Sequence, residues 1–326
     1  MCIDLTENWY NKYMKKILVT GALGQIGSEL IPELRKKYGK ENVIAVGHHK
    51  EPSEEFKNSG PFEIADSRNK DEIRILIEKY NIDTIFHLVG VLSAVGEKNP
   101  NLAWDVNMNG LKNILDLAVE YKIERLFWPS SIAAFGPTTP LYDTPQKTIL
   151  EPTTMYGVTK VSGELLCQYY FIKHGLDVRS LRYPGIISWK TPPGGGTTDY
   201  AVAIYYDAVK NGRYDCFVKE DTILPMMYMD DAVRATIELM EVEKEKITIR
   251  TAYNLTAISF SAKELAENVS KHINNFKCTF TPDERQKIAD SWPKTIDDKK
   301  AREDWGWQHR FDLDKISVEM IKNLKV

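Results

Sequence analysis

Gly21-Ala22-Leu23-Gly24-Gln25-Ile26-Gly27 is the stretch of this sequence that decides its fold. It follows a short apolar run at 16–20 and opens a helical pattern at 25–38, so it joins a predicted strand to a predicted helix. Glycines at this spacing allow a tight turn, a close approach of the backbone to a ligand and close packing of the helix on the sheet. The first turn of such a helix offers unpaired N–H groups and a partial positive charge. The sequence therefore predicts a turn that binds pyrophosphate.

Strand-like and helix-like runs alternate through the first half of the chain. Further strands are predicted at 43–46, 84–88, 125–128 and 177–182. Helices are predicted between them at 70–80, 101–121 and 156–174. This alternation predicts βαβ units and therefore an α/β fold with a doubly wound parallel sheet of the Rossmann type.

The second half of the chain is less regular. A helix is predicted at 200–210, and Ser261 with Glu264 has the spacing of a capping box that opens a helix towards His272. We expect three regions: an N-terminal extension at 1–13, a dinucleotide-binding core at 14–185, and a smaller C-terminal substrate lobe at 186–326 from which some elements return to the core.

The composition is that of a globular protein with a substantial core. Hydrophobic residues make up 43% and charged residues 27% of the chain, and the net charge is only -3. There is no basic surplus for nucleic acid, and no apolar run reaches the roughly 20 residues that span a membrane. Cys2, Cys167, Cys216 and Cys278 are far apart, without the spacing of metal ligands or of a disulfide framework. We therefore expect free thiols, no metal ion, no nucleic-acid or membrane partner, and a cytoplasmic location.

Tyr156 and Lys160 are the candidate acid–base pair. Four residues apart on a predicted helix, they share one face and lie about 6 Å apart. A neighbouring ammonium and a positively charged nicotinamide ring would both lower the pKa of a phenol, which is otherwise near 10. Tyr156 can then accept a hydroxyl proton while hydride leaves the same carbon. Ser130 and Ser131 follow the strand at 125–128, where a serine can orient the reacting oxygen, whereas His87, inside an apolar strand, is expected to be a core histidine.

The residues after the second strand bear on the choice of cofactor. An acidic residue normally stands there and binds the ribose hydroxyls of NAD, but this chain has Gly47. His48, His49 and Lys50 can instead face the 2′-phosphate of NADP, or form a solvated turn while the backbone or Asp66 contacts the ribose. We expect NAD, with NADP as the alternative.

The glycine turn, the serine and the Tyr-x-x-x-Lys pair, in this order, resemble the extended branch of the short-chain dehydrogenase/reductase superfamily. The pattern Ser-x-x-x-Phe-Gly places Ser131 at the branch's catalytic serine/threonine position. The resemblance implies Tyr156 as general base, Lys160 as its partner and ribose ligand, and Ser131 as the residue that orients the hydroxyl. The cofactor contacts that we expect are Gly21, Gly24, Gln25, Ile26, Gly27, His48, Asp66, Asn107, Tyr156, Lys160 and Ile186.

Longer stretches are similar to one family within that branch, the short-chain L-threonine 3-dehydrogenases. They include Gly-Gly-Gly-Thr-Thr-Asp-Tyr-Ala at 194–201, Leu-Pro-Met-Met-Tyr at 224–228 and Ile-Ala-Asp-Ser-Trp-Pro at 288–293. The similarity runs from 14 to about 313 and implies oxidation of L-threonine to L-2-amino-3-oxobutanoate by NAD. The chief departure is Gly47, where the family has Asp.

Substrate contacts are expected from Ser93, Ser131, Tyr156, Thr198 and Trp292. Thr197 and Thr198 precede the predicted helix at 200–210, whose N-terminus can bind a substrate carboxylate. Extended-branch enzymes commonly form homodimers through the helix that carries Tyr and Lys. The apolar contacts there would come from Leu165, Leu166, Tyr169 and Tyr170, which can equally be core residues.

Two other functions fit parts of this pattern. A nucleotide-sugar epimerase or dehydratase would use the same Ser, Tyr and Lys, and Arg213, Arg234 and Arg250 are available for its diphosphate, although no clustered basic motif is present. A protein that senses NAD(P) without chemistry often lacks the Tyr or the Lys, and this chain has both.

Overall fold

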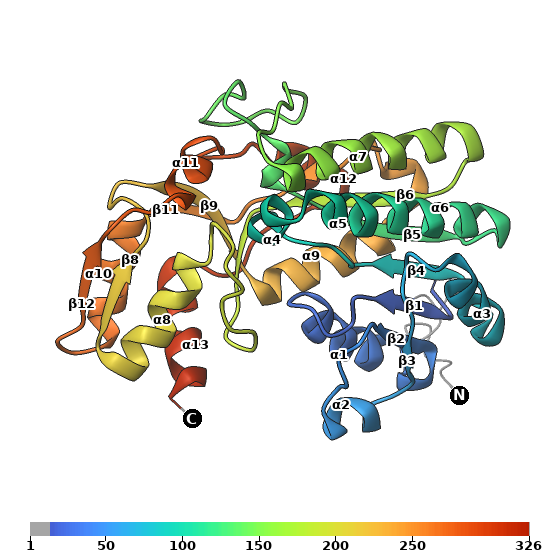
Figure 1. The fold of residues 1–326 in the computed structure, drawn as a ribbon, viewed down its shortest axis with the longest axis horizontal. Helices are drawn as coiled ribbons and strands as arrows, with labels where there is room; N and C mark the ends of the chain where they lie inside the picture. Colours follow the sequence, from blue (N-terminus) through green and yellow to red (C-terminus); the bar gives the residue numbers. More distant parts are fainter. Residues whose placement is uncertain (1–13, 326) are drawn as a thin grey trace, which may run out of the picture.

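The computed structural model describes residues 14–325, so the predicted extension at 1–13 lies outside the described residues. Seven parallel strands form its main sheet, in the order β10-β6-β5-β4-β1-β2-β3 (Figure 1). These strands are β1 (Ile17–Thr20), β2 (Val43–Gly47), β3 (Phe62–Ile64), β4 (Thr84–His87), β5 (Arg125–Ser131), β6 (Val178–Tyr183) and β10 (Tyr253–Asn254). This is the Rossmann order with one strand added at the edge, so the predicted doubly wound sheet is confirmed.

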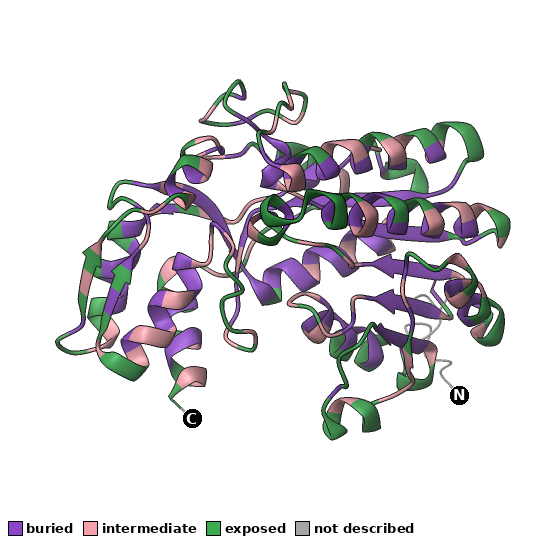
Figure 2. Ribbon diagram, viewed as in Figure 1, coloured by how far each residue is buried: buried purple, intermediate pink, exposed green. Residues whose placement is uncertain are grey.

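Helices cover both faces of this sheet. As a result, every strand from β1 to β6 except the edge strand β3 is buried along nearly its whole length (Figure 2). Successive side chains of a strand point to opposite faces. Ile17 and Val19 of β1 accordingly belong to the core under α1 and α9, and Leu18 to the core under α3 and α6. The helices around the sheet are α1 (Gly27–Tyr38), α2 (Glu54–Asn58), α3 (Lys70–Tyr80), α4 (Ser93–Lys98), α5 (Pro100–Trp104), α6 (Gly110–Glu120), α7 (Met155–His174), α9 (Met229–Glu241) and α12 (Lys299–Trp305).

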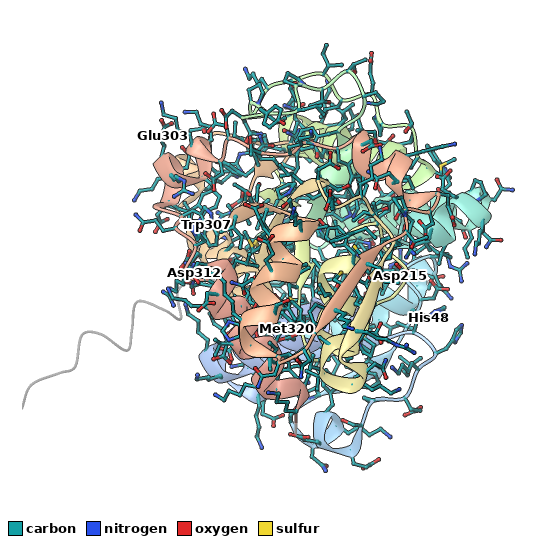
Figure 3. The ribbon with its side chains drawn as sticks, turned by 90° about the vertical axis from the view of Figure 1, so that its left-hand side faces the viewer. His48, Asp215, Glu303, Trp307, Asp312 and Met320 are labelled. Carbon is teal, nitrogen blue, oxygen red and sulfur yellow. The ribbon has the colours of Figure 1, made fainter. Side chains whose placement is uncertain are left out.

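A smaller lobe lies beside the main sheet, on the left in Figure 1. Its strands form one set in the order β11-β9-β7 and a pair of β12 with β8. The elements here are β7 (Gly185–Ile187), α8 (Tyr200–Asn211), β8 (Arg213–Cys216), β9 (Ile223–Tyr228), β11 (Ile258–Ser261), α10 (Ala262–His272), β12 (Lys277–Phe280), α11 (Arg285–Asp290) and α13 (Leu313–Leu324). The predicted capping box is present: Ser261 Oγ accepts from the N–H of Glu264, whose carboxylate accepts from the N–H of Ser261. Asp312 and Met320, labelled in Figure 3, mark α13 and its start on the face of this lobe.

The helix predicted at 101–121 is present from Pro100 to Glu120, with an irregular turn in its middle. A π-helical turn, Asp105–Asn109, separates α5 from α6. Within this turn, the buried side chain of Asn107 binds the loop after β4: its Oδ1 accepts from the N–H of Val91 at 2.7 Å, and its Nδ2 donates to the backbone oxygen of Val91 at 3.1 Å. Such turns are frequent at functional sites.

Candidate active site

The glycine turn lies at the carboxyl end of β1. Gly21 has a φ of 76°, and a Cβ there would lie 2.9 Å from the carbonyl carbon of Leu88. A Cβ at Gly27, where α1 begins, would lie 2.3 Å from the Gly21 oxygen. Within residues 14–325, no side chain caps the start of α1. The turn therefore brings bare backbone and free helix N–H groups to one place, which fits a pyrophosphate group.

Two adjoining cavities meet at this turn, and both are lined by Leu88 and Gly90. The first, of about 440 Å³, contains these predicted cofactor residues: Gly21, Gly24, His48 and Asp66. The second, of about 170 Å³, contains these predicted residues: Gln25, Ile26, Ser93, Ser131, Tyr156, Lys160, Ile186, Thr198 and Trp292. The predicted residues thus separate into an adenosine end and a reacting end, as an extended dinucleotide requires. Gly27 and Asn107 line neither cavity.

Asn107 supports the site from behind. Besides its bonds to Val91, Asn107 donates to Thr159 Oγ1 at 3.0 Å. Thr159 in turn donates to the backbone carbonyl oxygen of Tyr156 at 2.8 Å. These bonds link the loop after β4 to the helix that carries the acid–base pair. Asn107 therefore helps to position the helix of Tyr156 and Lys160 without lining either cavity.

The start of α7 fixes Tyr156. Thr154 caps the helix by accepting from the N–H of Gly157 at 3.1 Å, and Glu97 of α4 accepts from the N–H of Met155 at 2.6 Å. A Cβ at Gly157 would lie 2.3 Å from the Ala133 oxygen, so glycine is what lets α7 approach the end of β5. Tyr156 is thereby held beside the residues that end β5.

The predicted acid–base pair is assembled. Lys160 Nζ lies 5.2 Å from the centroid of the Tyr156 ring and donates to the Pro129 oxygen at 2.6 Å. Ser131 ends β5, and its Oγ accepts from the N–H of Ala133 at 3.2 Å. Tyr156, Lys160 and Ser131 therefore face one another across the second cavity.

Burial governs the ionisation of this pair. It raises the pKa of Tyr156 to about 12, opposed by a hydrogen bond with Ser131. It lowers the pKa of Lys160 to about 7, opposed by the carboxylate of Glu164. The lowering of the phenol pKa by the ammonium that was expected is not found here: burial dominates both groups, because a buried site disfavours either charge.

A buried ionic cluster under Lys160 was not predicted. Glu164 is 1% exposed and accepts from Arg182 Nε at 2.8 Å, from Arg182 Nη2 at 2.6 Å and from Ser130 Oγ at 2.5 Å. Arg182 also donates to Asn254 Oδ1 at 3.0 Å. The cluster ties α7 to β5, β6 and β10 immediately below the acid–base pair. The i, i+4 spacing of Lys160 and Glu164 is the one signal in the sequence.

The substrate end is formed by the segment before α8. Thr198 packs against Gly185 of β7, where a Cβ would lie 2.9 Å from the Thr198 side chain. Asp199, which was not predicted, lines the cavity, and its Oδ2 accepts from the N–H groups of residues 194, 195 and 196 at 2.7, 2.8 and 2.8 Å. The carboxylate of Asp199 thus lies directly before the first residue of α8. Its charge opposes a substrate carboxylate at this helix end and favours an ammonium group instead.

The arginines that could bind the diphosphate of a sugar nucleotide lie outside the second cavity. Arg234 pairs with Asp231, Arg250 pairs with Asp177, and neither they nor Arg213 lines the second cavity, where Lys160 is the one cationic side chain in the described part of the chain. Likewise, residues 14–325 contain no group of three or more side chains arranged to hold a metal ion.

Two more expectations can be compared with the structure. His87 is fully buried, with its Nδ1 2.7 Å from Thr20 Oγ1, and burial lowers its pKa to about 3, so it is a core histidine as expected. Among the described helices, none is long and apolar enough to cross a membrane.

Known proteins resemble the chain over almost its whole length. The mitochondrial L-threonine 3-dehydrogenase of Bos taurus is 50% identical over 308 residues, which cover 94% of this chain and 82% of that protein. The X-ray structure of L-threonine dehydrogenase from Clostridium difficile is 50% identical, with a TM-score of 0.93 over 96% of this chain and 98% of that one. A monomeric L-threonine 3-dehydrogenase from a metagenome, in its apo form, is 52% identical, with a TM-score of 0.91 over 95% and 98%.

A family model matches residues 17–255, the stretch that runs from β1 to just beyond β10 and carries the glycine turn, Ser131, Tyr156 and Lys160. The chain therefore belongs to the NAD dependent epimerase/dehydratase family.

Proposed function

We propose that this chain is an L-threonine 3-dehydrogenase, which oxidises L-threonine to L-2-amino-3-oxobutanoate with a nicotinamide cofactor, and that NAD serves as that cofactor. The observation that carries the proposal is the second cavity, where Ser131, Tyr156 and Lys160 meet Thr198 and Asp199. Identity of about 50% to L-threonine dehydrogenases over nearly the whole chain supports it.

The chemistry assigns one task to each side chain. When bound, the oxidised nicotinamide supplies the hydride acceptor and a positive charge. Tyr156, as phenolate, accepts the proton of the substrate hydroxyl while hydride leaves the carbon that bears it. Ser131 donates its hydroxyl hydrogen to the same oxygen and orients it, and the Lys160 ammonium stabilises the phenolate.

The distance between the pKa of Tyr156 and neutral pH is a reason for this pair to need the cofactor. With a pKa of about 12 for Tyr156, forming the phenolate at pH 7 costs about 7 kcal/mol, at 1.36 kcal/mol for each pKa unit. The charge that opposes this cost must come from Lys160 and from the bound cofactor, both next to the phenol. Proton transfer is therefore expected to be efficient only in the cofactor complex.

The two charges of the substrate have separate partners in the proposal. Asp199 binds the ammonium group, since it is the carboxylate that lines the reacting end of the cavity. Thr198 and the buried Ser93 offer hydroxyl groups to the carboxylate, and Trp292, 6% exposed, closes the cavity. In this assignment, residues 14–185 mainly hold the cofactor and 186–326 mainly hold the substrate.

We also propose that the protein forms a homodimer through α7. Leu165, Tyr169 and Ile172 of this helix are 56%, 50% and 66% exposed and lie on one face. Leu166 and Tyr170 instead pack into the core. One similar enzyme is described as monomeric. Similarity to other enzymes therefore does not decide the matter, and the proposal rests on the exposed apolar face of α7. For the compartment we propose the cytoplasm, supported by the three free cysteines in the described residues.

Product analysis tests the proposed reaction. The protein is incubated with NAD and L-threonine, or with L-valine, which has a methyl group in place of the hydroxyl, and the products are identified by mass spectrometry. Loss of two hydrogens from L-threonine alone is expected. A protein that leaves L-threonine unchanged, yet is protected by UDP against thermal unfolding, would instead be a sugar-nucleotide enzyme.

A further inference from the structure

The end of β2 lacks the acidic residue that normally binds the ribose of NAD, and an aromatic side chain lies against this position. Gly47 stands at this position, and a Cβ on it would lie 2.6 Å from Phe62 Cζ and 3.3 Å from Phe62 Cε2. Phe62 begins β3, which pairs with the end of β2. The Phe62 ring thus lies where a side chain at position 47 would begin, and a larger residue there would require this ring to move.

The lining of the adjoining cavity is basic. His48, His49, Lys50 and Arg68 all line it, and Asp66 is the one acidic side chain among the described lining residues. With both histidines neutral, the formal charge of the lining is +2 from Lys50 and Arg68 and -1 from Asp66, hence +1. An aspartate at 47 would bring this sum to zero.

The single acid of the cavity is already neutralised. Asp66 accepts from Arg68 Nη2 at 2.6 Å and from Arg68 Nε at 2.9 Å, and His48 Nε2 lies 3.1 Å from its Oδ2. The Arg68 guanidinium holds the pKa of Asp66 near 2, so the carboxylate stays ionised and paired. Within residues 14–325, Lys50 forms no ion pair, and its exposed side chain leaves one positive charge at the mouth of the cavity. His48 lies at the surface as well, on the side opposite Asp312 in Figure 3.

We propose that this cavity accepts the 2′-phosphate of NADP, with Lys50 and His48 as its partners, so that the chain takes NADP as well as NAD. The residues that end the second strand flank the 2′ position of the adenosine ribose in this fold. A carboxylate there both binds the 2′-hydroxyl and repels a 2′-phosphate, and this chain has lost both effects with one residue. The ammonium of Lys50 remains to attract the dianion, and His48 lines the same cavity.

The inference rests on the proposed function in one respect, namely that the bound cofactor serves the oxidation of L-threonine. Binding of the adenosine half can be measured without any amino acid. Failure of the protein to oxidise L-threonine would therefore leave this inference intact, and failure to bind the extra phosphate would leave the threonine reaction intact.

Calorimetric titration with two ligands provides the test. Adenosine 5′-phosphate and adenosine 2′,5′-bisphosphate differ only by the 2′-phosphate. The bisphosphate is expected to bind the wild-type protein at least tenfold more tightly, with a preference that weakens as salt is added. Equal or weaker binding of the bisphosphate to the folded protein would overturn the inference.

Variants assign the effect to the residues named. Lys50→Ala is expected to reduce the preference for the bisphosphate about five- to tenfold and to leave the affinity for adenosine 5′-phosphate unchanged. Lys277→Ala, at an exposed position of β12 in the other lobe, removes the same charge and is the matched control. A preference that survives Lys50→Ala, or that Lys277→Ala lowers equally, would contradict the role of Lys50.

A reverse variant restores the acid together with its space. Gly47→Asp/Phe62→Ala is expected to shift the preference towards adenosine 5′-phosphate by tenfold or more. Thermal unfolding shows whether this variant is folded, and the Lys50→Ala titration decides the question if it is not. A folded double variant that retains the preference for the bisphosphate would refute the argument from the end of β2.

Discussion

Replacement of Tyr156 by phenylalanine removes one oxygen from the reacting cavity and tests the acid–base assignment. General base catalysis contributes roughly 10²- to 10⁴-fold to a rate, so kcat should fall by that factor with L-threonine and saturating cofactor. The loss cannot be recovered by Lys160, because its Nζ is directed to the Pro129 oxygen at 2.6 Å. The variant should still fold, since one hydrogen bond with Ser131 is worth only about 1 kcal/mol.

The pH dependence of the same variant gives a second result. The reactive form of Tyr156 is deprotonated and its pKa lies above 7, so the wild-type rate should rise with pH up to about 7, above which Lys160 loses the ammonium that stabilises the phenolate. The phenylalanine variant should lose this rise, because it has no phenol to titrate. Initial rates follow the absorbance of the reduced cofactor, and Tyr169→Phe, at an exposed position of the same helix, is the matched control. A Tyr156→Phe variant within tenfold of wild type, with the same pH slope, would refute the assignment of the base.

Three further predictions concern the ionic cluster, the substrate charge and the dimer. Glu164→Gln leaves the buried charge of Arg182 without its carboxylate, so urea titration should show unfolding about 3–5 kcal/mol easier, and a change below about 1 kcal/mol would contradict the role given to this pair. Asp199→Asn removes the charge assigned to the substrate ammonium, so KM for L-threonine should rise roughly tenfold with a smaller change in kcat, and a fall in kcat alone would reject that assignment. Leu165→Glu should halve the particle mass in light scattering if α7 forms the dimer contact, whereas a wild-type protein that is already monomeric would exclude the dimer.

Local patterns in the sequence were sufficient to predict the main strands and helices of the fold. The glycine turn, the buried strands and the capping box of Ser261 depend on neighbours within a few residues, so they can be recognised without tertiary structure. The helix at 101–121 was predicted without its π-helical turn, in which Asn107 binds Val91 across 16 residues, a contact that no periodicity reveals. Short elements such as β3 and α4 were missed because they are set by pairing and packing rather than by their own sequence.

The candidate site was likewise predictable where spacing creates it. Two residues four apart share a face of any helix, so Tyr156 and Lys160 could be paired from their spacing. The end of the strand pointed to Ser130 and Ser131 alike, and only the resemblance to the extended branch selected Ser131. Asp199 was missed because its place in the cavity depends on a turn of three glycines that folds back onto its carboxylate. Phe62 could not be connected with Gly47 from the sequence, since only the pairing of β2 with β3 brings the ring to that position.

The most direct test of the central claim follows the absorbance of reduced cofactor after L-threonine is added, in parallel with NAD and with NADP. The account predicts turnover with L-threonine in the NAD sample, and in the NADP sample too if the adenosine cavity accepts the 2′-phosphate. A folded protein that binds either cofactor but produces no reduced form with L-threonine would contradict the account.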